Sequence, residues 1–132
     1  MKHRTSAQKK SERGAVAVEF ALVAPFLVAL IVGIIEFASA YNIQVSVTQA
    51  SREAARTMAI TKDPAQATAA GKAGAPSIDT ALLSFDYSAA TCVATTPPSN
   101  AVVTVTYSGT PLTGFFGSSL TLTGKGAMQC GG

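Results

Sequence analysis

Hydrophobic residues run almost without interruption through much of the N-terminal third of the chain. Between Ala15 and Ile35 the only charged side chain is Glu19. A helix over these positions rises about 1.5 Å per residue and is therefore about 30 Å long, which matches the hydrocarbon core of a bilayer. The pattern predicts a transmembrane helix that contains Pro25.

Beyond the apolar run the hydrophobic pattern becomes amphipathic. Apolar residues recur at spacings of three and four along one stripe, which continues the predicted helix to about Ile60. Such a stripe packs either on a sheet of its own chain or on a partner helix, and packing on its own sheet is the commoner outcome. The stripe consists of Ile43, Val47, Ala50, Ala54 and Met58.

A short second helix is predicted after residue 61. Asp63 followed by Pro64 is typical of an N-cap and a first helical position. The alanine-rich segment that follows ends before Pro76. Its low apolar bulk suits either close packing by small side chains or a mobile linker.

From about residue 78 the hydrophobic period changes to two, which is typical of half-buried strands. Three strands that pair in antiparallel fashion can cover one face of a helix. The residues expected on the covered face are Leu83, Phe85 and Tyr87, then Val103, Val105 and Tyr107, and finally Leu120 and Leu122.

The predicted fold is therefore α+β, with a long N-terminal transmembrane helix followed by a small head. The head contains a short helix and about three antiparallel strands. We expect a basic leader at 1–14, the long helix at 15–60, a linker with the short helix at 61–79, and the β-rich head at 80–132.

The net charge of +3 is unevenly distributed. Residues 1–14 contain five basic side chains and one acidic, whereas the rest of the chain contains five basic and six acidic. A cationic flank before a span places the N-terminus in the cytoplasm. The remainder has no basic patch, so a nucleic-acid partner is not expected.

Candidate chemistry is sparse. The only histidine is His3, and no constellation of acids, nucleophiles and bases indicates catalysis, so we expect no enzyme, cofactor or metal site. The two cysteines, Cys92 and Cys130, follow the predicted span and form either a disulfide outside the cytoplasm or two buried thiols. The segment Thr-Gly-Phe-Phe-Gly at 113–117 fits the core, a membrane contact or a subunit contact, of which the core is favoured.

Three interpretations of the apolar run remain open. It is a plain anchor, a signal peptide cut before Tyr41, or a prepilin cut between Gly14 and Ala15. The third gives Glu19 a role, because the new α-amino group on Ala15 is mostly protonated at neutral pH and can pair with the carboxylate of Glu19, on the same chain or a neighbour. On physical grounds alone, a glutamate that reaches headgroup water is an equal alternative.

The stretch from Arg13 to Ile60 resembles the TadE-like family, pseudopilins of the tight-adherence (Flp, type IVb-like) pilus system. The features that carry the resemblance are Gly-Ala-Val-Ala-Val-Glu-Phe at 14–20, Pro25, Gly-Ile-Ile-Glu-Phe at 33–37, and Ala-Ser-Arg-Glu-Ala-Ala-Arg at 50–56. The resemblance implies cleavage by a prepilin peptidase between Gly14 and Ala15. It also implies that Glu19 and Phe20 belong to the recognition and assembly motif.

The resemblance implies a structural role as a minor pilin or pseudopilin in the initiation, assembly or capping of a pilus. The implied partners are the peptidase, other pilins or pseudopilins, the assembly platform and the membrane. The implied location is the bacterial inner membrane, crossed once, with a periplasmic head that can enter the extracellular pilus. The alternative function is an anchored or secreted periplasmic binding module with no pilus role.

Overall fold

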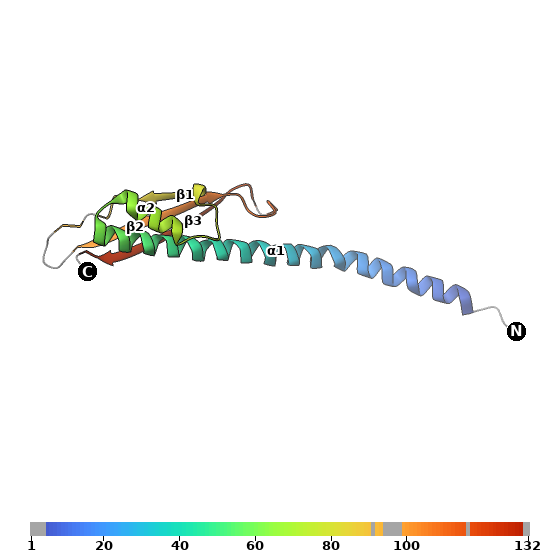
Figure 1. Cartoon of the computed structure of the whole chain (residues 1–132). Helices are drawn as coiled ribbons and strands as arrows, with labels where there is room; N and C mark the ends of the chain where they lie inside the picture. Colours follow the sequence, from blue (N-terminus) through green and yellow to red (C-terminus); the bar gives the residue numbers. More distant parts are fainter. Residues whose placement is uncertain (1–4, 91, 94–98, 116, 131–132) are drawn as a thin grey trace. The chain divides into compact units, whose positions relative to one another are not determined.

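The computed structural model describes residues 5–90, 92–93, 99–115 and 117–130, with side chains from residue 14 onward. The predicted α+β class is confirmed, because a long helix and a short helix are combined with a three-stranded antiparallel sheet (Figure 1). In chain order the elements are α1 (Thr5–Thr61), α2 (Pro64–Ala73), the 3-10 turn η1 (Thr80–Leu82), β1 (Leu83–Asp86), β2 (Asn100–Gly109) and β3 (Leu120–Gln129).

Helix α1 begins ten residues before the predicted start at Ala15 and continues through Pro25. The residues before Gly14 are mostly good helix formers, so nothing in them stops the helix from extending into the leader. The helix ends at Thr61, one residue beyond the prediction. Lys62 then takes a left-handed conformation with φ of 56°, which turns the chain out of the helix.

The chain forms two compact units, residues 1–37 and 38–132. The first contains the N-terminal part of α1. The second, here called the head unit, contains α1 from Ala38 onward together with α2 and the sheet. The amphipathic half of the long helix is thus part of the head unit's core.

The strands of the head unit are ordered β1-β2-β3, and both pairs are antiparallel. Leu83 pairs with Tyr107 and Tyr107 with Leu122, so the predicted covered residues share one face of the sheet. Strand β3 continues to Gln129, beyond the expected segment, and its residues pair along the whole of β2.

The core lies between this face and the stripe on α1. Val47, Ala50 and Ala54 are completely buried, and they pack in one cluster with Val103 and Val105. Ile43 and Met58 are partly buried against the same cluster. The amphipathic stripe therefore packs within its own chain, which was the favoured prediction.

Two glycines let α1 approach β3 closely. A Cβ atom on Gly124 would lie 2.9 Å from the carbonyl oxygen of Val47, and one on Gly126 would overlap the backbone of Ser51. Both glycines are buried on the face that carries Leu120 and Leu122. Helix and strand are thus in backbone contact, which any side chain at these positions would prevent.

The short helix α2 forms as predicted. Asp63 is its N-cap and accepts a hydrogen bond of 2.9 Å from the backbone N–H of Ala65, and Pro64 is its first residue. Ala67 and Gly71 are buried, and a Cβ on Gly71 would meet the ring of Phe85. Of the two uses predicted for this segment, close packing by small side chains is confirmed.

Candidate assembly and membrane surface

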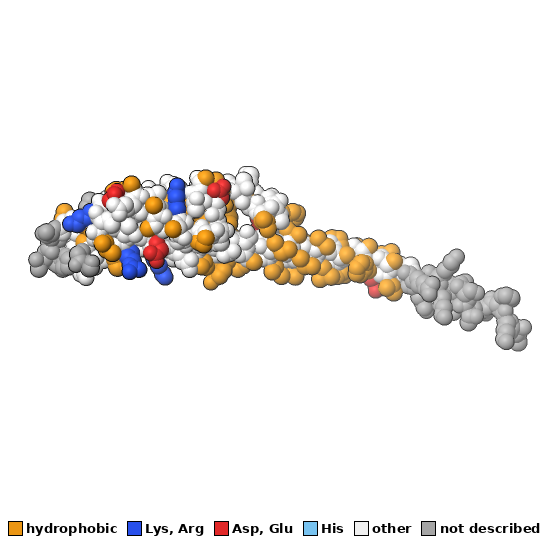
Figure 2. Space-filling view, viewed as in Figure 1, with side chains coloured by type: hydrophobic (Ala, Val, Ile, Leu, Met, Phe, Trp, Pro, Cys, Tyr) orange, Lys and Arg blue, Asp and Glu red, His pale blue; other side chains and the backbone are white. Residues whose placement is uncertain are grey.

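The first unit exposes a continuous set of large apolar side chains along α1. Each is at least 47% exposed. On the face shown in Figure 2, hydrophobic side chains cover most of this part of α1, with an acidic side chain near its N-terminal end, whereas the Lys and Arg side chains lie over the head unit together with further acidic ones. We call this set the α1 apolar surface; it comprises Val16, Val18, Phe20, Leu22, Val23, Phe26, Leu27, Val28, Leu30, Ile31, Ile34, Ile35 and Phe37.

Covering the α1 apolar surface with lipid or with other apolar helices is strongly favourable in free energy. Complete burial of one such side chain is worth about 1.5–3 kcal/mol. The thirteen residues are already partly shielded by the helix itself, so covering them stabilises the chain by on the order of 10 to 20 kcal/mol. From Gly14 on, α1 is long and apolar enough to cross a membrane, with a mean hydropathy of 2.6 in a window of which none is buried.

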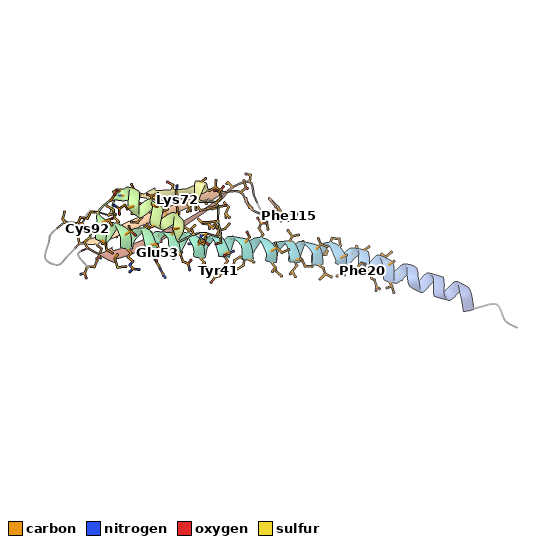
Figure 3. The ribbon with its side chains drawn as sticks, in the orientation of Figure 1. Phe20, Tyr41, Glu53, Lys72, Cys92 and Phe115 are labelled. Atoms are coloured by element: carbon orange, nitrogen blue, oxygen red, sulfur yellow. A yellow bond between two sulfur atoms is a disulfide. The ribbon has the colours of Figure 1, made fainter. Side chains whose placement is uncertain are left out.

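The predicted processing and recognition residues all lie on α1. Gly14, Ala15, Glu19 and Phe20 are exposed, and Phe20 is labelled in Figure 3. A Cβ atom on Gly14 would meet nothing within 4 Å. Nothing in the described fold therefore encloses the bond between Gly14 and Ala15.

Helical geometry brings two of these residues to the same face. Ala15 and Glu19 are four positions apart, so they are neighbours on the helix surface about 6 Å apart along the axis. Phe20 is rotated by about 100° from Glu19 and presents its ring in a different direction. Carboxylate and ring can thus contact two different partners in a helix bundle.

The end of the head unit that is remote from Tyr41 holds the two cysteines. The structure joins Cys92 and Cys130 by a disulfide, with their Cα atoms 5.5 Å apart. The backbone N–H of Cys130 also donates to the carbonyl oxygen of Ser99 at 2.9 Å. The disulfide and this hydrogen bond tie the end of β3 to the segment that precedes β2.

The favoured core position of the Thr-Gly-Phe-Phe-Gly segment is wrong for Phe115, which is 68% exposed. Phe116 lies outside the described residues. Gly114 and Gly117 both have positive φ, 68° and 149°, and Leu112 is exposed as well. Phe115 thus follows a glycine in the left-handed conformation and lies outside the core.

Sequence reasoning missed the role of the glycines in β3. Gly124 and Gly126 extend the period-two pattern of Leu120 and Leu122, and this alternation was the available signal. A glycine in a strand is compatible with a bulge, a bend or a close approach. Only the position of α1 identifies the last of these.

Among the described residues of the head unit, two carboxyl groups and one tyrosine have shifted pKa values. Hydrogen bonds from the backbone N–H groups of Ala65 and Ser88 lower the pKa of Asp63 and Asp86, respectively. Burial raises the pKa of Tyr87, whose hydroxyl lies 2.7 Å from that of Thr68. Within the described ranges, no group of three or more His, Cys, Asp or Glu side chains could hold a metal ion.

An open groove of about 600 Å³ lies between α1 and α2. Gln49, Arg52 and Glu53 line one side, and Ala70, Ala73 and Gly74 line the other. A carboxylate, a guanidinium and an amide beside small apolar residues do not form a nucleophile–base arrangement. The groove therefore suggests no reaction.

Comparison with known proteins gives a family match for the N-terminal part of the chain. Neither the curated proteins nor the solved structures give a significant match. The model of one protein family matches the segment that contains Glu19, Phe20 and the α1 apolar surface. Residues 14–56 match the TadE-like protein family, which confirms for this part of the chain the resemblance seen in its sequence.

Proposed function

We propose that this chain is a minor pilin or pseudopilin of a tight-adherence, type IVb-like pilus. In this role it is a structural subunit that takes part in initiation, assembly or capping. The observation that carries the proposal is the α1 apolar surface, which lies within the segment that matches the TadE-like family. A surface of this size is stable in a bilayer before assembly and among other apolar helices afterwards.

In the proposed pathway the chain inserts with its N-terminus in the cytoplasm and its head in the periplasm. A prepilin peptidase then cuts between Gly14 and Ala15. The cut removes the cationic leader and leaves a protonated amine on the helical face that carries Glu19. An acid costs about 2.5–3.5 kcal/mol at the centre of a bilayer and less near an interface, and the carboxylate of Glu19 favours the bundled state where its cationic partner is the amine of a neighbouring subunit.

The proposal is tested by intact mass and N-terminal peptide mapping of the protein from its own membranes. A mature chain that begins at Ala15 supports it. An N-terminus at Met1 indicates a plain anchor, and one at Tyr41 indicates a secreted module; either result overturns the processing step.

The role of Glu19 needs a separate experiment. Glu19→Ala should leave cleavage normal and reduce recovery of the subunit in assembled pili. Glu36→Ala, which removes the other carboxylate between the cleavage site and the head unit, is the matched control and should assemble normally. Normal assembly of Glu19→Ala with normal processing would show that Glu19 does not pair subunits.

A further inference from the structure

We infer that the described residues of the loop between β2 and β3 form a second membrane contact, which places Leu112 and Phe115 in the lipid headgroup region. The loop comprises residues 110–119, of which Phe116 lies outside the described residues. The inference rests on the proposed membrane span of α1. It goes further because it assigns a lipid-binding surface to the head unit.

The first argument is the direction of β3 relative to α1 within the head unit. The side-chain amide of Gln44 donates to the carbonyl oxygen of Thr123 at 3.0 Å. Further along both elements, Gly124 faces Val47 and Gly126 faces Ser51. Helix and strand therefore run in the same direction, and the start of β3 lies toward the start of the head unit.

The second argument is the position of Leu120 along the length of α1. Three strand residues, from Thr123 back to Leu120, span about 10 Å. About seven helix residues cover the same length, so Leu120 lies level with the first residues of the head unit. In Figure 3, Phe115 accordingly lies at the end of the head unit that holds Tyr41, whereas Cys92 lies at the other end. The chain passes from the first unit into the head unit at Ala38, three residues before Tyr41.

The third argument is the composition of the loop. Between Asp86 and Lys125 the sequence contains no charged residue, and the loop lies within this stretch. Leu112 is 67% exposed and Phe115 68% exposed. Insertion of the loop at an interface therefore desolvates apolar side chains without burying a charge, which is the favourable case.

The neighbouring residues suit the same environment. Tyr41, 65% exposed, is an aromatic residue of the kind enriched at membrane–water interfaces. Asp79 is an acidic residue of the head unit near this end, and its carboxylate caps η1 by accepting from the backbone N–H of Ala81 at 2.9 Å. The charged side chains that line the groove, Arg52 and Glu53, lie beyond Gln44 along α1 and are therefore further from the Tyr41 end. The polarity of the head unit thus fits a lipid surface at the Tyr41 end.

The experiment uses tryptophan reporters, because the chain contains no tryptophan. Full-length Phe115→Trp is reconstituted into phosphatidylcholine–phosphatidylglycerol vesicles. Its emission is measured with acyl-brominated lipid as the membrane quencher and with acrylamide as the aqueous quencher. Phe26→Trp reports the span, and Ile60→Trp, an exposed site at the far end of α1, is the aqueous control.

We expect brominated lipid to quench most of the emission of Phe26→Trp and Phe115→Trp but little of that of Ile60→Trp. Acrylamide should give the opposite order. Leu112→Trp is a second reporter of the loop and should behave like Phe115→Trp, so the conclusion does not depend on one variant.

Three other outcomes overturn the inference, and they are distinguishable. If Phe115→Trp behaves like Ile60→Trp while Phe26→Trp is quenched by lipid, the loop is in water and the span stands. Shielding of Phe115→Trp from both quenchers indicates a protein contact. If Phe26→Trp is not quenched by lipid, the span itself is wrong and the proposed function fails with it.

Discussion

The backbone contact between α1 and β3 makes Gly126→Ala the sharpest test of the head unit. The added methyl group would overlap the carbonyl group of Ser51 and lie 2.8 Å from the backbone nitrogen of Arg52. Backbone atoms of a packed helix cannot rotate away as a side chain does. The helix must therefore move from the sheet, which loosens the contacts of Val47 and Ala50 with Val103.

Overpacking of this kind typically costs about 1–3 kcal/mol. Because several backbone atoms are involved at Gly126, we expect about 3 kcal/mol, which lowers the folded-to-unfolded ratio by about 150-fold. Gly124→Ala brings its methyl group within 2.9 Å of the carbonyl oxygen of Val47. Its contacts are less severe, so the expected cost is about 1–2 kcal/mol.

The matched control is Gly74→Ala. Gly74 has φ of −74°, which alanine adopts without strain, and the nearest atom to the added methyl group is in the flexible side chain of Glu53, at 3.1 Å. Such a substitution reduces the entropy of the unfolded chain and stabilises by about 0.4–1 kcal/mol. The control therefore separates a general effect of replacing glycine from the effect of the helix–strand contact.

Urea unfolding of the full-length chain in detergent, followed by tyrosine emission, measures these free energies. An unfolding free energy of Gly126→Ala that is no lower than that of Gly74→Ala would refute the close approach of α1 to β3. Ser51→Gly in the Gly126→Ala background should give no rescue, because the overlap involves the backbone of Ser51 rather than its side chain.

Further predictions concern the rest of the head unit. Cys92→Ser with Cys130→Ser, a pair 38 residues apart, should lower the unfolding free energy by about 4 kcal/mol; no change would show that the disulfide contributes nothing. Burial raises the pKa of Tyr87 above its usual 10.0. The contribution of Tyr87 to stability is therefore fully present below pH 10 and is lost as the pH rises above it. Tyr87→Phe should remove this loss in thermal melts at alkaline pH. The pKa of Asp63 is lowered from 3.8, so its contribution is present above that pH and is lost as acid protonates it; acid unfolding of Asp63→Asn should lack this step.

The sequence was sufficient for the elements whose signal is local. A long apolar run, an Asp-Pro helix start and period-two alternation predicted α1, α2 and the covered faces of the strands, because each depends on neighbours along the chain. The motif around Glu19 was also readable, since it is contiguous and the family match covers it. The roles of Glu19 and Phe20 stay predictions until processing and assembly are measured.

Other features depend on which segments meet in space. The contact of Gly124 and Gly126 with α1 is visible only once the helix is placed against the sheet, and Phe115, which was expected in the core, is exposed in the structure. The sequence by itself determined the periodicity and the membrane-length helix, because both depend on the order of apolar and polar residues among neighbours along the chain. Only the tertiary structure decided the helix–strand contact and the exposed loop, because both result from packing between residues that are distant along the chain.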